Sequence, residues 1–386
     1  MRKTALKGKV VLEDKVLAGG LVVIEKEKIS KVYAQGSEFL EKEIHIIDYG
    51  DHFISPGLVD LHHHGALGKD VMDGEVKSLE LIASYQARHG VTGFLGTIMA
   101  SSLDTILKAV EAIKEAIKLQ LPSEILGVHI EGLYSNPSKK GAQDSDLIRS
   151  MSEKEFHLLV KAISGLKIIV SMAPEVKNNR SFIKPLREKG VIVSIGHSDA
   201  TYEEAHGSFA EGISHATHLF NAMSGFHHRE PGVVGAVLDS PEVTAEVIAD
   251  GLHIHPSALR LALAQKGRDK ICLISDSVKA AGLPDGIYQM GKLEIVLKEN
   301  EVRLRETGNL AGSVLMLNKA VKNVIEWIGI SVSQAVNMAS LNPSRVIGSE
   351  HEIGSIQKGK YADLVIFDQE FKVLETFLKG RLVFKS

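Results

Sequence analysis

The chain has 386 residues, a net charge of −3, and 24% charged against 44% hydrophobic residues. This balance is that of an ordinary soluble protein and excludes a strongly basic surface, so neither a nucleic-acid nor a membrane partner is expected. No apolar run reaches transmembrane length, and the N-terminus leads into an alternating strand pattern rather than a signal peptide. A single cysteine, Cys272, fits a reducing compartment, so we expect a cytoplasmic location.

Both ends of the chain have the composition of short strands. Stretches rich in β-branched residues occur at residues 10–12, 20–24, 29–32 and 43–47, and again at 362–367, 372–378 and 381–384. Neither end contains enough strand for a stable core of its own. We therefore expect residues 1–52 and 355–386 to pair into one small β-sandwich domain.

Strands and helices alternate between these ends, over residues 53–354. Apolar strand-like runs occur at residues 53–60, 91–97, 125–131, 167–174, 191–197, 212–218, 243–250 and 271–276, and helical periodicity at 76–89, 103–118, 153–163, 202–209 and 256–265. Eight buried strands with intervening helices predict an α/β fold of the (β/α)8 barrel type. A hairpin-like insert at residues 288–304 is expected to join the β domain, and helices at 314–328 and 333–340 to close the barrel.

The most informative motif is the run PGLVDLHHHG at residues 56–65. Side chains two apart on a strand share a face, so His62 and His64 point one way while His63 points the other. Two imidazoles that converge from a strand end form half of a metal site, although a surface histidine cluster is the alternative.

Residue types that ligate metals also gather at the C-terminal ends of the other expected strands, where barrel enzymes place their active sites. A single strand histidine is more often a packed residue than a ligand, but agreement among six strands favours a functional site. The full set is His62, His64, His129, Glu131, His197, His215, His218, Asp250, His253 and Asp276.

This set suits a hydrolase. Glu131, His197 and His218 could hold a divalent ion, which lowers the pKa of a bound water from about 15.7 to about 7. Asp276 could take the proton of that water and later pass it to a leaving amine. The alternative for Asp276 is a helix N-cap at the strand exit.

Several runs occur along the chain in the order found in one protein family. They are GVHIEG (127–132), KKGA (139–142), GHS (196–198), THLFNAM (217–223), HREPG (228–232), ADGLH (249–253), SDS (275–277) and LAGS (310–313). With these runs the chain resembles the N-acetylglucosamine-6-phosphate deacetylase family of the amidohydrolase superfamily. The NAM and REPG runs are specific to this branch, whereas the histidine run at residues 62–64 is shared across the superfamily.

The resemblance implies that Glu131, His197 and His218 hold the principal ion and that Asp276 is the general base and acid. His62 and His64 stand where two-metal members hold a second ion, so one or two divalent ions per subunit are expected, zinc or iron. The resemblance further implies a homodimer and an amino-sugar phosphate as substrate. Its expected contacts are Ala142, Gln143, Asn221, Ala222, Arg229, His253, Leu310, Ala311 and Gly312.

The role implied for Arg229 has an alternative, and two residues depart from the family's pattern. Arg229 would hold the phosphate with its planar guanidinium, although a surface ion pair with Glu230 is the other interpretation. Leu133 replaces the proline of the family's Glu-Gly-Pro run, which changes a turn but not the ligand Glu131. Gln143 replaces a histidine that contacts the acetamide carbonyl.

The Gln143 replacement bears on the rate. Glutamine donates only a neutral N–H, and charge-assisted hydrogen bonds are roughly twice as strong. Loss of an oxyanion donor costs about 100- to 1000-fold in turnover in other enzymes. Gln143 therefore indicates a slower enzyme, a shifted substrate or a local rearrangement in which another group serves.

The sequence predicts a metal-dependent hydrolase that converts N-acetylglucosamine 6-phosphate to glucosamine 6-phosphate and acetate. N-acetylgalactosamine 6-phosphate, which differs at one hydroxyl, is an alternative substrate. A degenerate barrel that binds a sugar phosphate without turnover is supported only by Gln143. A cyclic-amide hydrolase is disfavoured because the fourth strand, which ends near Ala173, has no lysine for carboxylation at the rim.

Overall fold

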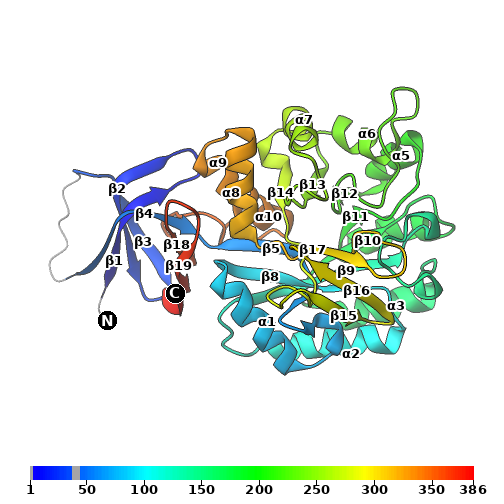
Figure 1. Ribbon diagram of the computed structural model, residues 1–386, viewed down its shortest axis with the longest axis horizontal. Helices are drawn as coiled ribbons and strands as arrows, with labels where there is room; N and C mark the ends of the chain where they lie inside the picture. Colours follow the sequence, from blue (N-terminus) through cyan, green and yellow to red (C-terminus); the bar gives the residue numbers. More distant parts are fainter. Residues whose placement is uncertain (1–2, 37–43) are drawn as a thin grey trace.

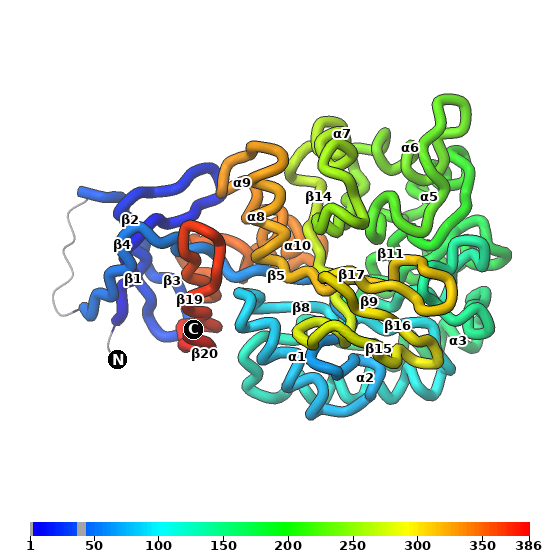
Figure 2. The backbone as a smooth tube through the Cα atoms, viewed as in Figure 1, coloured from blue at the N-terminus to red at the C-terminus, as the bar shows by residue number. Residues whose placement is uncertain are grey.

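The computed structural model describes residues 3–36 and 44–386, and in that part of the chain two regions are evident (Figure 1). A barrel of strands with helices outside forms the larger region, and a small β region lies beside it. Figure 2 shows that the first and last strands of the chain, coloured blue and red, lie together in the small region. Glu43, the first residue of the strand expected at 43–47, lies outside the described residues.

The small β region is built from both ends of the chain. Over residues 3–36 and 44–386, its strands form one seven-stranded sheet in the order β20-β19-β18-β4-β1-β2-β3. β18 is antiparallel to β4, with Leu364 opposite Pro56, so the C-terminal segment extends the N-terminal sheet. The expected pairing of the two ends is confirmed. The strands are β1 (Thr4–Val11), β2 (Val16–Glu25), β3 (Lys28–Tyr33), β4 (His45–Pro56), β18 (Leu364–Phe367), β19 (Val373–Leu378) and β20 (Arg381–Lys385).

One hydrophobic core serves six of these strands, which means that the sheet curves around it. The side chains that these strands give to the core are Leu6, Val10, Val22, Ile24, Ile29, Ile54, Leu364, Ile366 and Phe377. The division of the chain at residues 52 and 354 stays a prediction.

The carboxyl of Asp363, next to β18, is buried, and its Oδ1 accepts the Lys379 N–H at 2.7 Å. Burial raises the pKa of Asp363 from 3.8 to about 7. The unfolded carboxyl titrates near pH 4, so the stability that this proton contributes is full below about pH 4 and is lost as the pH rises through about 7.

We expect Asp363→Asn, which mimics the neutral carboxyl, to raise the free energy of unfolding at pH 8 by about 2–4 kcal/mol. It should also flatten the pH dependence between about pH 4 and 7. Urea unfolding across this range measures both effects. An unchanged slope against pH would contradict the assignment.

The barrel is an eight-stranded parallel sheet in the described part of the chain, with neighbouring strands in chain order. It closes at the C-terminal ends of the first and last strands, where the Asp276 N–H donates to the His62 carbonyl at 2.9 Å. A bridge between His63 and Ser277 lies beside this hydrogen bond. The strands are β5 (Leu58–His63), β8 (Val91–Ile98), β9 (Glu124–Tyr134), β10 (Lys167–Met172), β11 (Ile192–Ile195), β12 (Ile213–Ala216), β13 (Thr244–Val247) and β14 (Ile271–Leu273).

Amphipathic helices cover the barrel, and several begin at capping side chains: Ser102, Ser152 and Thr201 each accept an N–H of the first helical turn. The expected helices are α1 (Val76–Arg88), α2 (Leu103–Ala116), α3 (Glu153–Ile163), α5 (Tyr202–Glu211), α7 (Pro256–Lys266), α8 (Leu317–Ile328) and α9 (Val332–Met338). Three short helices were not expected: α4 (Ile183–Glu188), α6 (Gly232–Asp239) and α10 (Leu341–Val346). No helix among the described residues has the length and apolar character needed to cross a membrane.

The expected strand at residues 53–60 is wrong in its bounds, because it is divided between the two regions. Residues Phe53 to Pro56 end β4 and pair with β18, whereas β5 of the barrel begins at Leu58. Gly57 makes the connection, and a Cβ there would lie 2.1 Å from the Thr92 hydroxyl. Apolar content runs through the junction unbroken, so periodicity could not reveal it.

The insert after the last barrel strand does not join the β domain, contrary to expectation. Its strands β15 (Gly286–Met290), β16 (Leu293–Lys298) and β17 (Glu301–Leu304) form a separate antiparallel sheet. Its apolar face packs on Val278, Ala280 and Ala311, beyond the end of β14. The Ala311 N–H donates to Val302 O at 3.0 Å, so the insert also fixes the loop at residues 310–312. A short hairpin of β6 (Gly65–Ala66) and β7 (Lys69–Asp70) follows β5.

Candidate metal centre

Three of the predicted site residues lie two or three positions beyond the ends of their strands. His197, His218 and Asp276 follow β11, β12 and β14, with φ values of 50°, 33° and 48°. Left-handed backbone costs a non-glycine residue on the order of 1–3 kcal/mol, and such strain collects at functional sites. These turns place the three side chains together at the mouth of the barrel.

Glu131, His197 and His218 converge on one point. Glu131 Oε1 lies 2.7 Å from His197 Nε2 and 3.0 Å from His218 Nε2, and the two Nε2 atoms are 3.1 Å apart. All three side chains are buried at the end of the barrel. One carboxylate oxygen and two imidazole nitrogens are a donor set that divalent transition metals prefer.

The outer nitrogens of these imidazoles fix which nitrogen carries the proton. His197 Nδ1 lies 2.8 Å from Lys139 O and His218 Nδ1 lies 3.1 Å from Asn221 O. A carbonyl only accepts, so both Nδ1 atoms carry hydrogen, and each neutral ring then has its lone pair on Nε2, the nitrogen beside Glu131. Two Nε2 lone pairs and one carboxylate oxygen are three donor atoms that fit a metal ion.

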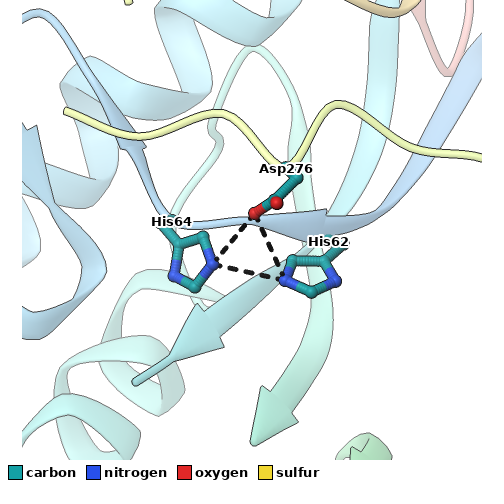
Figure 3. A group of neighbouring side chains, drawn as sticks. All are labelled: His62, His64 and Asp276. Carbon is teal, nitrogen blue, oxygen red and sulfur yellow. Dashed lines mark hydrogen bonds and ion pairs between the residues drawn. The ribbon is translucent and has the colours of Figure 1, made fainter. Parts of the chain in front are cut away.

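A second group adjoins the first. Figure 3 shows Asp276 pointing between His62 and His64, which project from β5 and the residue after it. The two Nε2 atoms are 3.2 Å apart, and Asp276 Oδ1 lies 3.5 Å from His62 Nε2 and 3.3 Å from His64 Nε2. Both nitrogens are 3.8 Å from an oxygen of Glu131, so this carboxylate lies between the two groups.

The charges in this region favour cations. Burial opposes ionisation of Glu131, but His197 and His218 hold the pKa of its carboxyl well below the usual range. Burial likewise opposes ionisation of Asp276, whose pKa His62 and His64 keep below its ordinary value. Although burial lowers the pKa of His62, the surrounding carboxylates raise it to about 10. A field that stabilises a proton at His62 also stabilises a metal ion.

A cavity of about 170 Å³ opens beside both groups. Of the predicted substrate contacts, Ala142, Gln143, Asn221, Ala222, His253, Leu310 and Gly312 line it. Ala311 is instead buried against the insert. Arg229 is exposed outside the cavity, with its Nη1 2.8 Å from His228 Nε2 rather than paired with Glu230.

Both the nitrogen and the oxygen of the Gln143 side-chain amide form hydrogen bonds. Its Nε2 donates to Glu131 Oε2 at 2.7 Å, and its Oε1 accepts the Ala100 N–H at 3.0 Å. Gly132 makes room for this side chain: it has a φ of 79°, and a Cβ there would lie 2.2 Å from the Gln143 amide carbon. Gln143 therefore holds a ligand carboxylate in this structure.

Other residues of the predicted rim have different surroundings. His129 and His215 are fully buried, and Asp250 Oδ2 binds His253 Nδ1 at 2.7 Å. Sequence reasoning missed Met99, Val278 and Met290, which line the cavity, and Glu246, which is buried among the histidines. Of these four residues, only Glu246 could have been noticed in the sequence, because it is a charged residue inside an apolar strand.

Comparisons with known proteins agree with this architecture. A model of the amidohydrolase family matches residues 53–383. The N-acetylglucosamine-6-phosphate deacetylase of Bacillus subtilis strain 168 is 36% identical over 382 residues, which cover 98% of this chain and 96% of that one. The N-acetylgalactosamine-6-phosphate deacetylase of Escherichia coli O157:H7 is 36% identical over 330 residues, covering 85% and 87%.

A solved structure is also similar over nearly the whole chain. The crystal structure of N-acetylglucosamine-6-phosphate deacetylase from Pasteurella multocida has a TM-score of 0.93 and 32% identity, and the match covers 98% of this chain and 99% of that chain. The similarity therefore extends across the barrel and the small β region together.

Proposed function

The chain belongs to the amidohydrolase family, and on that premise we propose that it hydrolyses the acetamide bond of N-acetylglucosamine 6-phosphate to acetate and glucosamine 6-phosphate. One observation carries the proposal: the buried carboxylate of Asp276 faces the same cavity as Glu131, His197 and His218. A base is thereby placed beside a ligand set, which is the arrangement that hydrolysis of an unactivated amide requires.

Each residue of the centre has a separate role in the proposed reaction. When bound by Glu131, His197 and His218, a divalent ion supplies a water of lowered pKa and polarises the acetamide carbonyl. Asp276 is ionised, so it can accept the proton of the attacking water. The new C–O bond forms at the carbonyl carbon, and Asp276 returns the proton to the amine nitrogen as the C–N bond breaks. Zinc or iron is the proposed ion, with a second ion at His62 and His64.

The remaining lining residues are proposed to hold the sugar phosphate. Asn221 and Ala222 follow the ligand His218 on one turn, so they are positioned beside the reacting bond. His253 contacts a sugar hydroxyl in this proposal, with Asp250 fixing its ring. Ala142 and the loop from Leu310 through Ala311 to Gly312 close the cavity on the other side.

Arg229 is proposed to bind the phosphate in a homodimer. It is exposed in the single chain, and two large apolar side chains near the proposed contacts are exposed with it: Phe226 at 64% and Leu252 at 48%. A partner subunit would cover such a surface and enclose the phosphate end of the cavity. Light scattering measures the molar mass, and a monomer at micromolar concentration would contradict this part of the proposal.

A cytoplasmic location completes the proposal. The single cysteine, Cys272, is buried in β14 as a free thiol, which suits a reducing compartment.

Acetate release from purified, metal-replete protein tests the function. We expect turnover of N-acetylglucosamine 6-phosphate that depends on bound metal. Similarity to the Escherichia coli enzyme makes N-acetylgalactosamine 6-phosphate the second candidate, so both sugars are compared by kcat/KM. No acetate above the level of the Asp276→Asn variant, from either sugar, would contradict a deacetylase.

The replacement of Gln143 by histidine tests the departure from the family pattern. We expect Gln143→His to leave folding intact and to raise turnover by about 10-fold or more, because an imidazolium donates a stronger hydrogen bond to the developing oxyanion. Steady-state kinetics and thermal unfolding measure the two effects. An unchanged or lower rate would indicate that the hydrogen bond from Gln143 to Glu131 is the arrangement this site requires.

A further inference from the structure

One buried carboxylate at the centre of the barrel has no place in the proposed reaction. Glu246 lies on β13 with no exposed surface, among histidines from other strands. Its Oε2 lies 3.0 Å from His62 Nδ1, and its Oε1 lies 3.1 Å from His215 Nε2. Burying a carboxylate is costly unless its hydrogen bonds are satisfied, so this side chain is held by specific partners.

Its contact with His62 determines how that ring can bind a metal. Glu246 Oε2 also accepts the backbone N–H of His218, and a carboxylate oxygen has no hydrogen to donate to His62. His62 Nδ1 therefore carries the hydrogen of this bond. The Nε2 atom, on the opposite side of the ring, then faces His64 and Asp276 (Figure 3).

The same carboxylate reaches the other ion position. Glu246 Oε2 accepts the backbone N–H of His218 at 3.3 Å, and its carbonyl accepts the Leu219 N–H at 2.8 Å. His218 has the strained φ of 33°, so these two hydrogen bonds support a turn that would otherwise relax. Glu246 thus contacts both halves of the centre without facing the cavity.

A metal ion directly on Glu246 is the competing interpretation, because Glu246, His62 and His129 also lie close enough to share one. The partners of His129 argue against it. His129 Nδ1 lies 3.1 Å from the Leu61 carbonyl, which requires a hydrogen on that nitrogen, and its Nε2 lies 2.8 Å from the Ser171 hydroxyl. His129 has no free lone pair directed at Glu246, so the group is a hydrogen-bonded support.

We propose that Glu246 is a positioning residue that selects the His62 tautomer for the second ion and supports the His218 turn of the principal ion. This inference rests on the proposed function only in needing both ion positions. Carboxylate partners of ligating histidines contribute about 10- to 100-fold to metal affinity in other proteins.

Zinc titration of the metal-free protein against a chromophoric chelator tests the proposal. We expect two binding steps in the natural protein. His62→Gln should lose one of these steps. Glu246→Gln should lower the zinc affinity of that same step by about 10- to 100-fold and the affinity of the other step by a smaller factor. Glu155→Gln removes a different buried carboxylate, one paired with Arg149, and should leave both steps unchanged.

The double variant of His62 and Glu246 distinguishes a positioning role of Glu246 from a general loss of folded structure. With His62→Gln already present, adding Glu246→Gln should change the remaining zinc affinity by less than about 3-fold, because the His218 turn keeps the hydrogen bond from the Leu219 N–H to the Glu246 carbonyl. Equal weakening of both steps, or two unchanged steps, would overturn the inference. A natural protein that binds a single zinc would overturn it as well. Two tight zinc sites without acetate release would contradict the proposed function alone.

Discussion

Asparagine in place of Asp276 is expected to lower kcat by about 100- to 10,000-fold, the usual contribution of a positioned general acid–base. The amide keeps the shape of the side chain but cannot accept the proton of the attacking water or return one to the leaving amine. Substrate affinity should change little, because the contacts proposed for the sugar phosphate lie elsewhere in the cavity.

Metal content must be measured with this rate, since Asp276 Oδ1 also lies within 3.5 Å of His62 and His64. We expect the principal ion to be retained. Asp363→Asn, the same change far from the cavity, is the matched control and should keep full activity. Turnover within about 10-fold of the natural protein would rule out Asp276 as the proton carrier.

Glu131→Gln should remove the principal ion and with it the activity. The Glu131 carboxylate supplies the negative charge between His197 Nε2 and His218 Nε2 and also contacts Gln143 Nε2. A neutral amide loses that charge and meets the Gln143 amide with an unfavourable N–H to N–H contact in one of its orientations. We expect zinc affinity to fall by more than about 100-fold, which exceeds the usual effect of an outer partner.

The measurement for Glu131→Gln is zinc content after gel filtration together with acetate release. Glu155→Gln serves again as the buried-carboxylate control. Turnover restored at saturating zinc would show that Glu131 contributes affinity only. A stoichiometric zinc content in the variant without added metal would contradict its role as a ligand.

Much of this architecture is readable along the chain. The alternation of buried strands and amphipathic helices predicts the barrel, because each pattern reports which face of one element meets a core. The two β-rich ends predict a shared domain, since neither has enough strand alone. Residues at consecutive strand ends also indicate the rim, which is why His197, His218 and Asp276 could be proposed together.

The sequence pattern did not predict which helices and strands contact one another. Periodicity did not show that β4 ends at Pro56 in the small sheet, or that the insert from Gly286 to Leu304 covers the barrel end. Both have strand-like apolar patterns, and a pattern states that a face is buried without naming the surface that buries it. Pairing and packing partners decided those two outcomes.

The sequence by itself determined the residue types of the centre and their places at strand ends. Only the tertiary structure decided which of them meet. Closure of the barrel by the Asp276 N–H and the His62 carbonyl brings the first and last strands together, and Glu246 Oε2 lies 3.0 Å from Nδ1 of the same His62. The reason is physical: hydrogen bonds of about 3 Å between strands far apart in sequence depend on closure of the whole sheet, which no local pattern encodes.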